Sequence, residues 1–132
     1  HPGVFACGKV LHVHDHVDYV TLESQIAREG AAEYILGKGS CEKVYVNTTT
    51  GNGVRYLVPQ RVNIKNENDV KLYFRVGRIF KNAKVVLECD GEIISSKKKV
   101  KLAPGEMENV VIPAATLAKM TKDSTIVVRV EE

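Results

Sequence analysis

The 132-residue sequence contains no tryptophan, and its aromatic residues are five tyrosines and three phenylalanines. No run of about eighteen apolar residues is present, which excludes a candidate transmembrane helix. The formal net charge is only +3, whereas nucleic-acid-binding domains are usually more basic and set that charge among aromatic residues. A membrane span and nucleic-acid binding are therefore both disfavoured.

Several motifs of cofactor, metal and catalytic sites are also missing. The sequence has no Gly-x-Gly-x-x-Gly turn, so it lacks the pyrophosphate-binding turn of a dinucleotide fold. Its cysteines, Cys7, Cys41 and Cys89, are odd in number and widely spaced, which disfavours a disulfide framework and a Cys-x-x-Cys metal site. We expect them to act as small apolar residues in a reducing cytoplasm. No nucleophile–base–acid motif occurs, so no catalytic residue is predicted.

The first part of the sequence reads as a short buried strand, a polar loop and an amphipathic helix. The strand is expected at residues 4–7 and ends at Gly8. The helix is expected to begin between Asp15 and Asp18, with Asp15 as its cap, and to stop at Gly37. Small side chains that would let its apolar face pack closely on a sheet are Ala27, Gly30 and Ala31.

Residues 2–8, Pro-Gly-Val-Phe-Ala-Cys-Gly, resemble the C-terminal flavin fingerprint of the pyridine nucleotide–disulfide oxidoreductase superfamily. That fingerprint is followed by a helix rich in glycine and alanine, which residues 25–32 supply. Residues 10–15, Val-Leu-His-Val-His-Asp, are similar to the branch associated with glycerol-3-phosphate dehydrogenase-type subunits, which carries an extra domain after the flavin fold. The resemblance implies that this chain is the C-terminal piece of an FAD-dependent, NAD(P)-linked oxidoreductase and cannot hold FAD alone.

The resemblance also implies a set of residues that would line the cofactor. Backbone NH groups near the helix start would face the flavin pyrimidine oxygen, where the positive helix end stabilises the reduced, anionic flavin. The family has an acidic residue directly after the glycine, but this chain has Lys9, which donates hydrogen bonds and cannot accept them. The implied FAD-lining residues are Gly8, Lys9, His14, Asp15, Val17 and Asp18.

The loop before the helix carries alternating histidines, His12, His14 and His16, with Asp15 and Asp18 beside them. If extended, the three imidazoles would point one way, and imidazole and carboxylate are ligands for zinc and other first-row metals. The favoured interpretation is a polar loop that caps the helix and covers a ligand, because no distant fourth ligand accompanies the motif. No metal ligand is therefore predicted, and a metal-binding accessory protein is the weakest alternative function.

After residue 43 the hydrophobic period changes from helical to alternating, which predicts a β domain at 41–132 after a flavin-domain remnant at 1–40. About seven short strands joined by turns are typical of an immunoglobulin-like β-sandwich. Asp90-Gly91 predicts a tight hairpin, and Pro104-Gly105 predicts a type II turn. Strands are expected at 43–47, 54–58 continuing as 61–64 around Pro59, 70–76, 85–89, 92–102, 107–112 and 125–130, with a turn at 48–53 and a helical turn at 113–120.

The predicted strand 92–102 carries a run of lysines, Lys97, Lys98, Lys99 and Lys101. Such a run could meet phosphate or an acidic partner, but more often it is a solvated sheet edge that prevents edge-to-edge aggregation. Because the sandwich shows no chemistry of its own, we expect it to be a non-catalytic interface for a homo-oligomer or a partner oxidoreductase subunit. The alternative function is a free-standing sandwich module that binds protein or carbohydrate.

Overall fold

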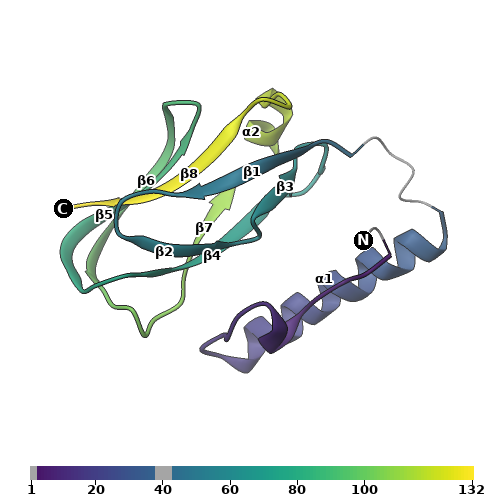
Figure 1. The fold of residues 1–132 in the computed structure, drawn as a ribbon, viewed down its shortest axis with the longest axis horizontal. Coiled ribbons are helices and arrows are strands. Elements are labelled where there is room, and N and C mark those ends of the chain that lie inside the picture. The colour runs from purple at the N-terminus through teal and green to yellow at the C-terminus, as the bar shows by residue number, and fades with distance from the viewer. Residues whose placement is uncertain (1–2, 38–42) are drawn as a thin grey trace. The chain divides into compact units, whose positions relative to one another are not determined.

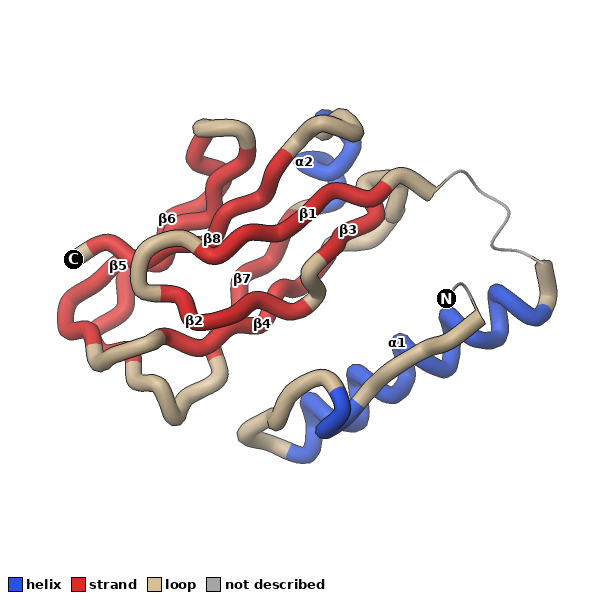
Figure 2. Tube along the Cα trace, in the orientation of Figure 1, coloured by secondary structure: helices blue, strands red, loops and turns tan. Residues whose placement is uncertain are grey.

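The structure is a computed structural model that describes residues 3–37 and 43–132. The chain divides into two compact units on either side of the boundary between Glu42 and Lys43. The described part of the first unit is helical, and the second unit is a β-rich domain (Figures 1 and 2). None of the helices formed by the described residues has the length and apolar character that a bilayer crossing needs.

Within residues 43–132 the strands form a five-stranded sheet in the order β3-β1-β8-β5-β6 and a three-stranded sheet in the order β2-β4-β7 (Figure 2). The two sheets enclose one apolar core, which confirms the prediction of a mainly β protein with a sandwich. A short helix, α2 (Ala114–Lys119), connects β7 to β8. The strands are β1 (Tyr45–Thr50), β2 (Val54–Val58), β3 (Arg61–Asn63), β4 (Val70–Val76), β5 (Phe80–Cys89), β6 (Glu92–Leu102), β7 (Glu108–Ile112) and β8 (Thr125–Glu131).

The sandwich forms because its strands place alternate apolar residues on the inner face. In β8, Ile126, Val128 and Val130 are buried, while the residues between them remain partly accessible. They meet Leu72 and Phe74 of β4 in the same core, and all five side chains are almost fully removed from solvent. Strand β8 is held on both sides, parallel to β1 and antiparallel to β5, so it lies at the centre of the larger sheet.

Two turn predictions differ from the structure. Residues 48–50 belong to β1 rather than to a turn, because residues 47–50 pair in parallel with residues 125–128 of β8. The turn at Pro104-Gly105 is closed by a hydrogen bond from the Glu106 amide to the Ala103 carbonyl at 3.0 Å. Gly105 does not have the positive φ that a type II turn requires at this position, so the turn is not of type II. The sequence pattern did not decide this, because proline is also favoured at the second position of a type I turn.

The hairpin prediction is confirmed, since Asp90 and Gly91 both have positive φ, at 51° and 85°. The strand that follows it, β6, lies at one edge of the five-stranded sheet within the described residues. Its Lys97, Lys98 and Lys101 are exposed. The lysine run therefore occupies a solvated sheet edge, as expected, where charged side chains oppose pairing with another strand.

In the first unit the helix α1 (Val17–Ile35) begins and ends where the sequence predicts. Its N-cap is His16 rather than Asp15, and the His16 side chain makes no capping hydrogen bond. Residues 4–7 are not a strand, which corrects the predicted strand-loop-helix order. A strand needs a neighbour to share its backbone hydrogen bonds, and none of the described residues provides one here. The chain instead runs without regular structure into a single 3-10 turn, η1 (Gly8–Val10).

This N-terminal segment runs along α1 (Figure 1), and its Phe5 lies on the helix face that carries Gly30. A Cβ atom added at Gly30 would lie 3.0 Å from Cε1 of Phe5, so the phenyl ring sits directly on the glycine. The Phe5 ring also meets the Tyr34 ring edge-on, with centroids 6.2 Å apart. The thin face of α1 therefore permits close packing, but the partner is an irregular segment of its own unit rather than the sheet that the sequence predicts.

Candidate functional site

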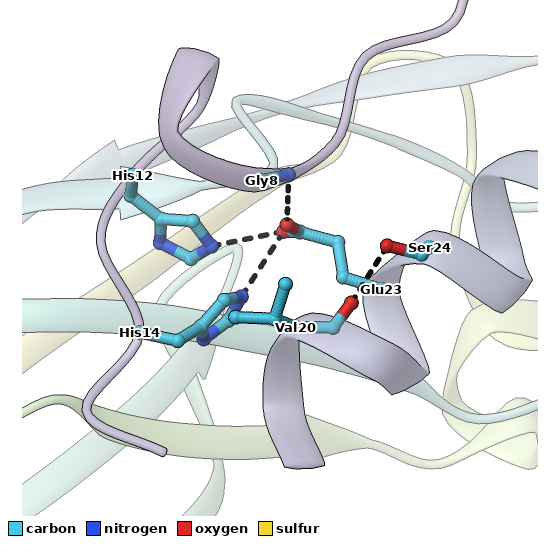
Figure 3. A network of polar contacts seen from close by, with 6 residues as sticks. All are labelled: Gly8, His12, His14, Val20, Glu23 and Ser24. Carbon is cyan, nitrogen blue, oxygen red and sulfur yellow. Dashed lines mark hydrogen bonds and ion pairs between the residues drawn. The ribbon is translucent and has the colours of Figure 1, made fainter. Parts of the chain in front are cut away.

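The turn at Gly8 brings the histidine loop back beside the helix. Gly8 has φ of +73°, a conformation that residues with a Cβ rarely adopt, and its carbonyl accepts hydrogen bonds from the Leu11 and His12 amides at 3.0 and 3.3 Å. The chain reverses through η1 and leaves residues 12–14 alongside the first turns of α1 (Figure 3). One glycine conformation thus sets the position of two imidazoles.

The centre of the site is the carboxylate of Glu23, on the second turn of α1 (Figure 3). Its Oε2 atom accepts a hydrogen bond from the Gly8 amide at 2.7 Å. Its Oε1 atom lies 3.0 Å from Nε2 of His12 and 3.3 Å from Nε2 of His14. The two imidazole rings are packed against each other, with centroids 4.2 Å apart and planes tilted by 66°. A turn, a loop and a helix therefore converge on one carboxyl group.

These groups are shielded from solvent although the unit around them is small. The side chains of His12 and His14 are 2% and 0% exposed, and that of Glu23 is 13% exposed. Burial raises the pKa of the Glu23 carboxyl, but the hydrogen bond from Gly8 and the contacts with His12 and His14 lower it further than burial raises it. The pKa of Glu23 therefore lies below its ordinary value, and the group is a carboxylate at neutral pH.

The structure brings together only some of the residues implied to line a flavin. Gly8 and His14 meet at Glu23. The other four are exposed: Lys9 lies in η1, Asp15 precedes the helix, and Val17 and Asp18 are the first two residues of α1.

The expectation that the three alternating histidines point one way is wrong for the third of them. His12 and His14 face Glu23, whereas His16 is exposed and its ring lies 6.0 Å from the Tyr19 ring. The reason is that His16 is the N-cap residue, so the chain there already turns into α1. Extended alternation holds only for the first two histidines of the motif.

Glu23 and the inward position of His12 were not predicted as site residues, but the sequence holds a signal for Glu23. At about 100° per residue, Glu23 falls on the same helical face as Ala27, Gly30 and Ala31. A carboxylate in the middle of an apolar face needs partners to offset its burial. The alternating histidines immediately before the helix were the available partners.

The cysteines among the described residues are not joined in a disulfide. Cys7 and Cys89 are free thiols, the first half-buried and the second buried, and Cys41 lies outside the described residues. Burial raises the pKa of the Cys89 thiol, and the neighbouring Asp90 carboxylate raises it further. Cys89 is therefore protonated at neutral pH, in agreement with its expected role as a small apolar residue.

No family model, no curated protein and no solved structure matches this chain. The class of protein must therefore be inferred from the residues and their geometry.

Proposed function

We propose that the chain is the C-terminal part of an FAD-dependent, NAD(P)-linked oxidoreductase. In this proposal residues 1–40 complete the flavin domain, and residues 41–132 form a non-catalytic interface domain of immunoglobulin-like type. The observation that carries the proposal is the local order at Gly8, where an irregular segment ends in a positive-φ glycine, a tight turn follows, and a loop leads into the N-terminus of a 19-residue helix. Backbone that turns on glycine toward a helix start is a common setting for a cofactor oxygen or phosphate.

The apolar surface of the first unit supports the same proposal. Among the described residues of that unit, α1 buries none of its own side chains. Val10, Val17 and Ile35 are 79%, 75% and 81% exposed, and Ile26 is exposed as well. Exposed apolar surface of this extent marks a face that packs against another segment or partner. In a complete flavin domain, the neighbouring strands and helices would cover this surface.

The residues at the start of α1 fit an electron-rich flavin oxygen. The His16 side chain makes no capping bond to the first turn, and in the proposal the amide groups of Val17 and Asp18 donate to the flavin oxygen instead. When bound, FAD supplies the hydride chemistry between nicotinamide and the next electron acceptor. The positive end of the helix would stabilise negative charge on the reduced cofactor, and the exposed Lys9 could donate a hydrogen bond to a phosphate or hydroxyl.

Gly8 and His14 would act in this site by holding the loop in place. Both are tied to Glu23, which fixes the path of the chain from η1 to the helix start. The sandwich would join two copies of the enzyme, or the enzyme and a partner oxidoreductase subunit, in the cytoplasm. The raised pKa of its buried Cys89 thiol, which keeps the thiol protonated, supports a non-catalytic role for this domain.

The proposal is tested on the longest natural polypeptide that contains this chain. We expect it to purify with FAD, and we expect Gly8→Ala to lower the flavin content at least about threefold, because an alanine at φ of +73° costs about 1–2 kcal/mol and shifts the loop. The matched control is Gly37→Ala, at φ of +68° beyond the other end of α1, which should keep its flavin. Neither added Cβ atom would meet a neighbour within 4 Å. The two substitutions therefore impose a similar backbone strain and differ only in which end of α1 they affect.

A folded polypeptide without flavin would overturn the proposal and favour the free-standing sandwich module. Equal flavin loss in Gly8→Ala and Gly37→Ala would contradict the role given to the Gly8 turn.

A further inference from the structure

We propose that His12, His14 and Glu23 form a binding site for a divalent transition-metal ion of the zinc type. Each of the three offers one donor atom, and these atoms all lie within 4.8 Å of one another. Two imidazoles and one carboxylate are a donor set that zinc and iron(II) accept, with positions left open for water or a substrate. The proposal needs no residue outside this chain, because all three ligands belong to it.

The spacing of the donor atoms agrees with tetrahedral coordination. Ligands placed about 2.0–2.1 Å from a zinc ion at tetrahedral angles are about 3.3 Å apart. The Glu23 Oε1 atom is 3.3 Å from Nε2 of His14 and 3.0 Å from Nε2 of His12. Two of the three donor separations are therefore close to the tetrahedral value, and all three donor atoms lie within 4.8 Å of one another.

The surroundings hold the ligands in this arrangement. The Gly8 amide donates to the second oxygen of Glu23, which leaves Oε1 directed at the two imidazoles (Figure 3). A hydrogen bond to the outer oxygen of a ligating carboxylate is the kind of support that orients metal ligands in proteins. The low exposure of all three side chains also distinguishes the cluster from surface histidines that collect metal adventitiously.

The rival interpretation is a purely internal hydrogen-bonded cluster in which the carboxylate bridges two imidazole N–H groups. It predicts the same distances without any ion. The two interpretations differ in whether the folded chain binds zinc, and in whether His12 and His14, rather than His16, contact the bound ion.

The test is a zinc titration of the chelator-treated 132-residue chain against a chromophoric competitor. We expect one zinc ion per chain, and we expect Glu23→Gln, a change of similar size and shape, to weaken binding by at least about 100-fold, because loss of a ligand costs more than loss of a supporting group. The matched control is His16→Ala, which removes an exposed imidazole from the same loop and should change the affinity by less than about threefold. Circular dichroism shows whether each variant retains α1.

A second measurement needs no variant. Cobalt(II) added to the wild-type chain should give the intense ligand-field bands of four-coordinate cobalt and should broaden the imidazole resonances of His12 and His14 much more than those of His16. Three results would overturn the proposal. They are no zinc binding by the folded chain, equal loss of affinity in His16→Ala and Glu23→Gln, and broadening of all three imidazoles alike. The last two would indicate adventitious binding by the loop.

Discussion

Among the glycines of the described residues, Gly53, in the turn between β1 and β2, is the one at which an added Cβ atom meets the closest contact. It has φ of +78°, and a Cβ atom there would overlap Cζ of Phe80, whose ring is buried at the end of the core. Gly53→Ala therefore combines two costs. An alanine in the left-handed region costs about 1–2 kcal/mol. Forcing an extra carbon against a packed ring costs about 1–3 kcal/mol. We expect the free energy of unfolding to fall by about 2–5 kcal/mol.

Two other glycines separate these costs. Gly91→Ala carries the backbone cost alone, because its φ is +85° and an added Cβ would meet nothing within 4 Å. Gly51→Ala carries the crowding cost alone, because Gly51 has no positive φ while its Cβ would lie 2.5 Å from Cβ of Arg129. Alanine also stabilises by about 0.4–1 kcal/mol through the unfolded chain. This contribution enters twice in the sum of the Gly51 and Gly91 losses and once in Gly53→Ala, so we expect the sum to fall short of the Gly53→Ala loss by about that amount.

The assay is urea denaturation of the full chain followed by circular dichroism of the β domain. Domains of this size unfold with m values of about 1–3 kcal/mol/M, so the loss in Gly53→Ala should lower the midpoint by about 0.7 M or more. The losses in the Gly51 and Gly91 variants should sum to roughly that of Gly53→Ala. A Gly53→Ala protein no less stable than Gly91→Ala would refute the reasoning, because the Phe80 contact would then cost nothing.

Two further predictions concern the same domain. Leu72→Ala removes a fully buried side chain from the centre of the core and should lower the free energy of unfolding by about 2–5 kcal/mol, measured by the same urea titration; a loss below about 1 kcal/mol would contradict the assignment of β4 to the core. Hydrogen bonds from the Thr125 amide and the Ser124 hydroxyl hold the pKa of Asp90 below its ordinary value. The folded-state pKa is thus below the unfolded one, so this stabilisation is present above the unfolded pKa of about 3.9 and is lost as pH falls through the folded value. Asp90→Asn, which suits the positive φ of this position, should make the urea midpoint depend less on pH below about pH 4, and an unchanged pH profile would remove Asp90 as its cause.

The β domain could be predicted from sequence because each strand carries its own signal. The alternation in β8 and the Asp90-Gly91 pair are local features, and both correspond to the observed elements. The extent of β1 could not be read in the same way. Its last residues are threonines next to a glycine-rich turn, and they become strand only by pairing with β8, more than seventy residues later in the chain.

The sequence predicts only part of the candidate site, because the site also depends on contacts between residues that are not adjacent in the chain. The alternating histidines were evident, but their third partner depends on the turn at Gly8, which carries the loop back over α1. The alternating pattern predicts the same orientation for His16 as for His12 and His14. His16 is instead exposed, because it is the N-cap residue of α1 and the chain turns into the helix there. The segment at residues 4–7 was expected to be a strand from its apolar composition, yet strand structure also needs a neighbouring strand, and within the described residues there is none.

The central claim, that the Gly8 turn and the start of α1 belong to a flavin site, is tested most directly by a reductive titration. The longest natural polypeptide containing this chain is titrated without oxygen with NADH and with NADPH while its visible spectrum is recorded. The account predicts an oxidised flavin spectrum that one equivalent of one of these nicotinamides bleaches. A correctly folded polypeptide with no flavin spectrum, or with a flavin that neither nicotinamide reduces, would contradict it.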